Sequence, residues 1–191
     1  MGFAARWIRS APIGPYALSA TCTGLALAQG AGAGPIVARA APIVYWARAS
    51  APVVGDPCDI EEQHFVFALI APLRLAPGRR SRWRAWALAP ALAAYRHFGV
   101  HAYLDDDAIS LNGRRIAACG ARQAGACALV VSSFLPRPPG GLADWAERDL
   151  EDAFRSRVEA QHDWQFENSW PSEPERSAIA DALAEEIADA K

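Results

Sequence analysis

Two adjacent arginines, Arg114 and Arg115, follow an Asn112-Gly113 pair that joins two short apolar segments. A guanidinium group binds carboxylate or phosphate oxygens through paired hydrogen bonds, so these residues could hold an anionic ligand. Asn-Gly is the strongest short-range signal for a two-residue hairpin turn, because both central residues need positive φ. We therefore predict one strand over 109–111 and its partner over 114–118. Side chains alternate along a strand, so only one of the two arginines is expected to face a pocket.

The composition narrows the chemistry further. The chain has 191 residues, of which 52% are hydrophobic and 21% charged, as expected for one folded domain rather than a disordered chain. Its 19 basic residues are 18 arginines and a single lysine, Lys191. The interior therefore offers no lysine for a Schiff base or for a phosphate-binding P-loop.

Charge is unevenly distributed along the chain. Residues 1–140 carry 14 arginines against 7 acids, whereas residues 141–191 carry 5 basic residues against 14 acids. We expect the acidic segment to fold back on the basic body, and the alternative is that it masks a basic site.

The cysteines and histidines show no catalytic or metal-binding pattern. Cys22, Cys58, Cys119 and Cys127 lack CxxC spacing, which argues against a zinc site and favours reduced thiols in a cytoplasmic protein. Cys119 and Cys127 are expected to be packing residues that could face each other across strands. Cys58 is expected to be more exposed, with a thiol of low reactivity because acids flank it. The four histidines are interpreted as structural, and the acidic run Asp105–Asp107 as a solvated loop.

The N-terminal 30 residues loosely resemble a signal peptide, with a basic start and an Ala-x-Ala-like site, but their middle is only weakly apolar. No run is long and apolar enough to span a membrane, so we expect no membrane partner.

Strand-like and helix-like patterns are segregated, which indicates an α+β domain with a mixed or antiparallel sheet and flanking helices. Gly99 is placed as the C-cap of a helix that contains Pro90, and Ser172 with Glu175 forms a capping-box pattern. Before the hairpin, the predicted elements are a helix over 16–28, an edge strand over 35–46 interrupted by Pro42, a loop over 49–63, a buried strand over 64–73 and a helix over 83–98. After the hairpin we predict a strand over 126–134, a helix with apolar spacing from Leu142 to Val158 and an aromatic connector over 162–170. A last helix has Ile179, Leu183 and Ile187 on one side.

The segment "FGVHAYLDDDAISLNGRRIAACGARQAGACALVVSSF" (98–134) resembles the core of the biotin/lipoate protein ligase and octanoyltransferase superfamily. The matching positions are the helix exit Phe98-Gly99-Val100, the turn Asn112-Gly113-Arg114, Ile116-Ala117, Arg122 and Gly125. The resemblance implies the α+β fold of that catalytic domain. It divides the chain into a ligase-like core, 1–140, and an acidic helical segment, 141–191, packed on it within the same domain. For an active member it implies ATP and a lipoate- or biotin-like acid as ligands, and an acyl-carrier or lipoyl/biotinyl-type protein as partner.

Four motifs of that superfamily are altered together. Arg115 stands where the resemblance places the lysine that contacts the activated acyl group. The glycine-rich loop corresponds to "RASAPV" at 48–53, the His-Gly pair to Val130-Val131, and the Asn-Asp pair to Asp107-Ala108. Without those glycines the backbone cannot approach an acyl-adenylate closely. This pattern suggests a ligase fold that no longer adenylates.

Three function hypotheses follow. The first is a non-adenylating protein that binds an acyl or nucleotide-like ligand, or a carrier protein. Its groove would be lined by Arg115 as the lysine equivalent and by Arg48, Ser50, Asn112, Gly113, Arg114 and Arg122. The second is an active lipoyl, biotinyl or acyl transferase that uses Arg115 as its cation. The third is a nucleic-acid or phosphate-binding module acting through the arginines of 74–84, although no nucleic-acid motif accompanies them.

Overall fold

The computed structural model describes residues 2–30, 40–54, 58–106, 108–139 and 144–189. Its elements follow one another in the order β1 (Phe3–Arg9), α1 (Pro15–Gly30), β2 (Ile43–Arg48), β3 (Phe65–Pro72), the 3₁₀ turn η2 (Arg80–Arg82), α2 (Trp83–His97), β4 (Tyr103–Asp105), β5 (Ala108–Leu111), β6 (Arg114–Ala124), β7 (Cys127–Phe134), α3 (Glu147–His162), β8 (Trp164–Ser169) and α4 (Glu173–Asp189).

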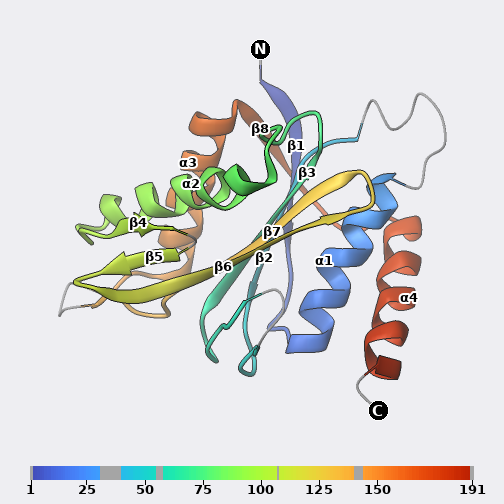
Figure 1. The fold of residues 1–191 in the computed structure, drawn as a ribbon, viewed down its shortest axis with the longest axis horizontal. Helices are drawn as coiled ribbons and strands as arrows, with labels where there is room; N and C mark the ends of the chain where they lie inside the picture. Colours follow the sequence, from blue (N-terminus) through green and yellow to red (C-terminus); the bar gives the residue numbers. More distant parts are fainter. Residues whose placement is uncertain (1, 31–39, 55–57, 107, 140–143, 190–191) are drawn as a thin grey trace.

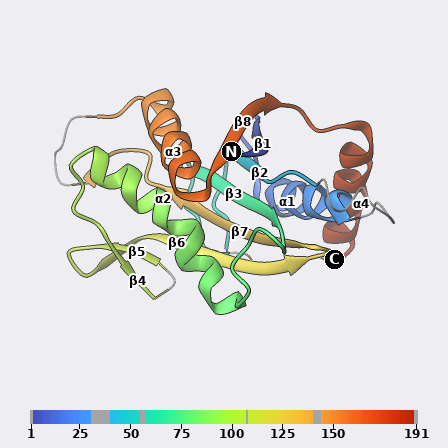
Figure 2. The same ribbon diagram turned by 90° about the horizontal axis from the view of Figure 1, so that it is seen from above.

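The strands described form one eight-stranded mixed sheet in the order β4-β5-β6-β7-β3-β2-β1-β8. Pairing is antiparallel from β4 to β2, whereas β1 runs parallel to both β2 and β8. Helices α2 and α3 cover one face of the sheet, α1 covers the other, and α4 packs outside α1 (Figures 1 and 2). The predicted α+β class with a mixed sheet and flanking helices is therefore confirmed.

The strand next to Pro42 was placed wrongly by the sequence reasoning. Strand β2 begins at Ile43 and lies inside the sheet between β1 and β3, not at its edge. Pro42 precedes the strand, and its carbonyl still accepts a hydrogen bond from the backbone N–H of Arg6. A proline at the start of a strand costs no ladder hydrogen bond, so it did not require an edge. Residues 35–39 of the predicted strand lie outside the described residues.

Two further strands were missed. β1 lies in the N-terminal stretch that resembles a signal peptide, and β8 forms where an aromatic connector was predicted. β1 pairs with β8 over six residues, from Phe3 opposite Trp164 to Ile8 opposite Ser169. The short strand β4 takes in Asp105 of the acidic run read as a loop, and Asp107 lies outside the described residues.

Most of the other predicted elements appear close to their expected bounds, but β6 continues to Ala124, six residues beyond the predicted strand over 114–118. Helix α2 continues through Pro90, and Gly99 follows its C-cap with a φ of +77°. Helix α3 begins at Glu147, after Trp145, and Leu142 lies outside the described residues. On α4, Ile179 packs against the core, whereas Ile187 is 46% exposed.

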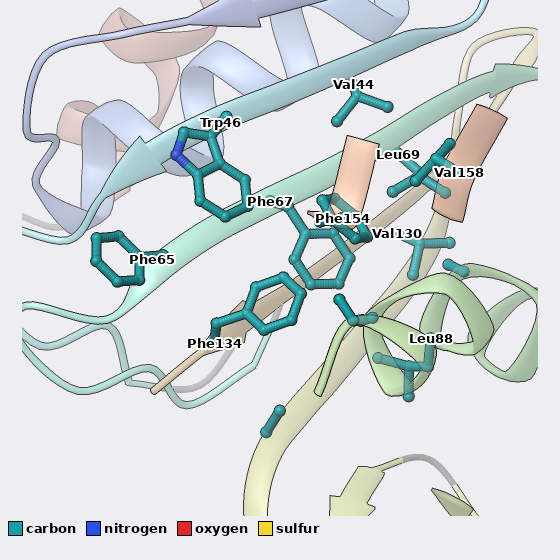
Figure 3. Close-up of a cluster of buried hydrophobic side chains, with 14 of the residues drawn as sticks. Val44, Trp46, Phe65, Phe67, Leu69, Leu88, Val130, Phe134, Phe154 and Val158 are labelled. Carbon is teal, nitrogen blue, oxygen red and sulfur yellow. The ribbon is translucent and has the colours of Figure 1, made fainter. Parts of the chain in front are cut away.

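The core on the α2/α3 face is built from aromatic rings. The indole of Trp46 stacks on Phe65 with ring centroids 6.0 Å apart, and the ring of Phe154 lies 4.6 Å from Phe67 (Figure 3). Phe134 contacts the rings of Trp46 and Phe67 at 5.9 and 5.4 Å. Large rings in this offset and tilted packing contribute both buried area and ring–ring attraction, so they fix which side chains of β2, β3 and β7 face α2 and α3.

Acidic side chains of the C-terminal segment pair with arginines of the body. The carboxylate of Glu175 accepts hydrogen bonds from Arg6, and also from the backbone N–H and hydroxyl of Ser172, which is the predicted capping residue. These donors hold the pKa of Glu175 below its usual range against the opposing effect of burial. Glu147, at the start of α3, binds both Arg9 and Arg48 at 2.9 Å.

The close crossing of α1 and α4 depends on Gly24. A Cβ at this position would lie 2.5 Å from the Cα and N of Ile179. Alanine normally favours a helix over glycine by about 1 kcal/mol. We expect Gly24→Ala to destabilise the protein by about 2 kcal/mol instead, because the backbone of α4 must move away. Urea unfolding measures the difference. Gly78→Ala, where a Cβ meets nothing within 4 Å, is the matched control and should stay within about 0.5 kcal/mol. A stabilised Gly24→Ala protein would contradict this packing.

His162 gives the fold a defined pH dependence. Its ring packs against both Trp86 and Trp164, with centroids 4.6 and 5.0 Å away, and burial lowers its pKa from 6.5 to about 4. Between these values the unfolded chain binds the proton and the folded protein does not, so stability falls as pH drops from 6.5 to 4. We expect a slope of up to about 1 kcal/mol per pH unit. Urea unfolding across this range should show a smaller slope for His162→Gln. An unchanged slope would contradict the assignment.

Candidate functional site

The Asn112-Gly113 turn has the predicted geometry. Both residues have positive φ, 50° and 75°, and Leu111 pairs with Arg114 directly across the turn. The register then shifts, because Ser110 pairs with Arg115 and Ile109 with Ala117, which leaves Ile116 as the extra residue of a β-bulge. A bulge redirects the side chains on its strand. Four successive residues of β6, 115–118, consequently contribute to one wall.

That wall bounds a cavity of about 280 Å³ beside the hairpin. The segment before β3 forms the opposite side through Pro52, Val53, Val54, Asp59, Ile60 and Glu61, and the sheet contributes His64 and Ser133. Val53 and Ile60 exchange backbone hydrogen bonds of 2.8 and 2.9 Å, which fixes this segment. The cavity is therefore an apolar space with one arginine, Arg115, and two carboxylates at its walls.

His64 and Ser133 are the buried polar side chains of this cavity, at 7% and 1% exposure. His64 Nδ1 lies 3.3 Å from Ser133 Oγ, and its Nε2 lies 3.7 Å from the carboxylate of Glu61. Burial lowers the pKa of His64, and Glu61 offsets this only in part, so the surroundings favour the neutral imidazole.

Arg115 is the one residue of the predicted site set that lines this cavity. Asn112, Gly113 and Arg114 are exposed at the tip of the hairpin, outside the lining residues. Ser50 is exposed, and its backbone N–H donates to the carbonyl of Ile13.

The other two predicted arginines lie elsewhere. Arg48 donates to Glu147 at 2.9 Å, and its guanidinium lies over the ring of Phe65, 4.8 Å from the centroid. Arg122 donates to Thr23 Oγ1 of α1 at 2.6 Å. Neither side chain is among the lining residues of the cavity, so the prediction that both would line one groove with Arg115 is not supported by their positions.

Sequence reasoning missed His64 and Ser133 as site residues. His64 was grouped with the scattered structural histidines, and Ser133 was part of a core strand. The available signal was the alternation of side chains along a strand. His64 directly precedes Phe65 and Ser133 directly precedes Phe134, each at one end of a strongly apolar strand. If Phe65 and Phe134 face one side of the sheet, His64 and Ser133 must face the other.

The four cysteines are all buried thiols, including Cys58, which was expected to be exposed but is 7% exposed. Its Sγ lies 3.5 Å from the carbonyl oxygen of Val131, which it can reach because residues 58–60 fold onto the sheet. Cys119 pairs with Ser132 and Cys127 with Ala124, so the two do not face each other across the hairpin.

The arginine run at 74–84 is spread over a loop, η2 and the start of α2. All five arginines are exposed; Arg74 also donates to the carbonyl of Ala40 and Arg80 to that of Ala121. Among the residues described, no group of three or more His, Cys, Asp or Glu side chains could hold a metal ion. No helix in the described ranges has the length and apolarity needed to cross a membrane.

A second cavity, of about 430 Å³, lies between α3 and the strands β1 and β8. The carboxylate of Glu151 accepts a 2.7 Å hydrogen bond from Trp7 Nε1 and lies 3.5 Å from Arg9. Arg155 donates to Asn168 and to the carbonyl of Phe166. These charged groups are thus paired within the protein, and none of the predicted site residues lines this space.

The mixed sheet with helices on both faces matches the fold of solved lipoate and biotin protein ligases. The bipartite lipoate protein ligase of Thermoplasma acidophilum is similar over 95% of this chain and 92% of its own, with a TM-score of 0.73 and 9% identity. A lipoate-protein ligase A bound with ATP is similar over 95% and 94%, with a TM-score of 0.68 and 9% identity.

A Helicobacter pylori biotin acetyl coenzyme A carboxylase synthetase with bound biotinylated ATP covers 82% of this chain and 75% of its own, with a TM-score of 0.58 and 12% identity. No protein-family model and no curated protein matches the sequence. The likeness therefore lies in the fold.

The thiols provide a direct check of the packing. Burial raises the pKa of Cys22 to about 12 and that of Cys127 to about 11. At pH 8 we expect the native protein to react with a disulfide reagent on the order of 100-fold more slowly than a free thiol, since the thiolate is the reactive form. In denaturant all four thiols should react. Mass spectrometry of the labelled protein measures both. Rapid labelling of a native cysteine would show that its strand or helix is not packed as described.

Proposed function

We propose that this chain is a ligase-like protein that binds a carboxylic acid in the cavity beside the hairpin and does not adenylate it. The observation that carries this proposal is the position of Arg115 at the wall of a cavity with seven apolar lining residues, where it is the one basic group beside the carboxylates of Asp59 and Glu61 and the polar pair His64 and Ser133. A guanidinium group at the end of an apolar space suits a ligand with an anionic head and a hydrocarbon body.

Solved neighbours support the choice of ligand class. A putative lipoate protein ligase of Thermoplasma acidophilum with bound lipoic acid has a TM-score of 0.71 over 95% of both chains, at 10% identity. The fold thus accommodates an acid of this type in that protein. In this chain the resemblance places the acyl-contacting lysine at Arg115, which keeps the positive charge but is planar and larger.

The segment at 48–53 supports the absence of adenylation. Where the resemblance places a glycine-rich loop, Pro52 and Val53 contribute side chains to the cavity wall. Arg48, at the start of this segment, is bound to Glu147. Backbone N–H groups approach a phosphate closely only where glycines leave room, so this segment is poorly suited to hold ATP.

Two alternatives share the same fold. If Arg115 replaces the lysine functionally, the protein is an active lipoyl, biotinyl or acyl transferase that forms an acyl-adenylate. The carrier of such a group would be a lipoyl or biotinyl domain, and one similar ligase belongs to a lipoylation system that includes its E2 lipoyl domain. A nucleic-acid or phosphate-binding module that acts through the arginines of 74–84 is the third candidate function, because these side chains are exposed on one loop and helix start.

Thermal-shift measurements with lipoate, octanoate and biotin, each with and without ATP, test the proposal. We expect one acid to stabilise the wild type without ATP. In Arg115→Ala its affinity should fall roughly 10- to 100-fold, because a charge-assisted hydrogen bond is lost. Arg114→Ala is the matched control: it removes the neighbouring arginine, which is outside the lining residues, and should leave binding unchanged. Arg115→Lys should retain part of the affinity.

A pyrophosphate-release assay with the same acids separates the alternatives. The proposal expects no release above background. Release that depends on Arg115 would establish the active transferase instead. If no acid stabilises the protein, the ligand-binding proposal fails. In that case, nucleic-acid affinity that falls steeply with salt would favour the third function.

A further inference from the structure

The cavity beside the hairpin has a polar inner end. Most of its lining residues are apolar, including Val53, Ile60 and Ile116, but His64 and Ser133 meet there with almost no exposure to solvent. Burying polar groups carries a cost unless they are hydrogen-bonded, and a cavity made only for a hydrocarbon chain would not need them. Their presence indicates that the far end of the ligand is polar as well.

The pair has hydrogen-bonding capacity left over. A serine hydroxyl has one donor and two acceptor sites, and the contact with His64 Nδ1 at 3.3 Å uses one of them. If the imidazole accepts this hydrogen bond, Ser133 Oγ can still accept one from a ligand. If the imidazole donates it, the Ser133 hydroxyl can donate to a ligand. In either tautomer the pair suits a hydroxyl or amide-like group on the ligand.

Arg115 and this pair are separated along the sheet. Ser132 pairs with Cys119, so Ser133 lies beside Ala118 of β6. Arg115 is three residues before Ala118, with the bulge between them. At 3.3 Å per strand residue the two polar sites are on the order of 10 Å apart. A medium-length acid can therefore place its carboxylate at Arg115 and its other end at Ser133.

We infer that the acid bound in this cavity carries a hydrogen-bonding group at the end opposite its carboxylate, and that Ser133 and His64 select for that group. The inference rests on the proposed function, and it adds the chemical class of the ligand. A plain alkyl end would displace water from Ser133 and His64 without replacing its hydrogen bonds. A site built to hydrogen-bond a ligand group rejects an analogue that lacks it much more strongly than a hydrophobic pocket rejects a missing methylene.

Two acids of equal chain length, octanoate and 8-hydroxyoctanoate, test this selection in calorimetric titrations of the full chain. We expect the wild type to bind 8-hydroxyoctanoate roughly tenfold or more tightly than octanoate. Ser133→Ala should reduce that ratio to about twofold or less, because the hydroxyl partner is lost. Ser132→Ala is the matched control. Its hydroxyl donates to the carbonyl of Ala118, and it is not a lining residue, so the ratio should match the wild type.

The outcomes separate the inference from the proposed function. Equal wild-type affinities for the two acids, both lost in Arg115→Ala, would overturn the selection by Ser133 and leave the acid-binding function standing. A preference that persists in Ser133→Ala would overturn it too. Binding of neither acid by the wild type would count against both the inference and an octanoate-like ligand. If Ser133→Ala does not fold, equal wild-type affinities for the two acids still overturn the inference.

Discussion

Side-chain alternation on β3 and β7 is the constraint on which the site depends. Phe65 and Phe134 are fixed in the aromatic core by contacts with Trp46, Phe67 and Phe154. Successive residues of a strand point to opposite faces, so His64 and Ser133, their immediate neighbours, are held on the other face. A one-residue shift of β3 would turn the His64 imidazole toward the aromatic rings, and a shift of β7 would do the same to the Ser133 hydroxyl. Burying either polar group there would cost a large amount of folding free energy. The packing that stabilises the domain therefore also places the polar end of the cavity.

The arginines show how partners decide what one residue type does. The sequence prediction placed Arg48 and Arg115 on one groove; Glu147 at the start of α3 binds Arg48, and Arg115 lines the cavity beside the hairpin. Arg6 is bound in the same way by Glu175 of α4. The acidic segment 141–191 thus supplies counter-charges to the basic body at defined contacts, in addition to a strand of the sheet. Arg115 keeps its place at the cavity because the hairpin and its bulge set its direction locally.

Local signals in the sequence were sufficient for the turn at Asn112-Gly113, the capping residue Ser172 and the helix end at Gly99, because each depends on backbone geometry within a few residues. Alternation along the strand predicted that only one of Arg114 and Arg115 faces a pocket, and Arg115 is the one that lines the cavity. Local signals could not show that His64 and Ser133 lie next to each other. They lie 69 residues apart and meet only through the register of β3 against β7. β1 and β8 were missed for a related reason, since they pair with each other from opposite ends of the chain.

The parallel pairing of β1 with β8 has a consequence for how the protein is made. Phe3 emerges from the ribosome long before Trp164, its neighbour in the sheet. Until then, the β8-facing edge of β1 stays unpaired on the nascent chain, and exposed strand edges recruit other chains. Pairing between strands so far apart in the sequence also slows folding, because the entropy of closing the long loop is lost before the stabilising contacts form. The sheet becomes complete only when nearly all of the domain has been synthesised.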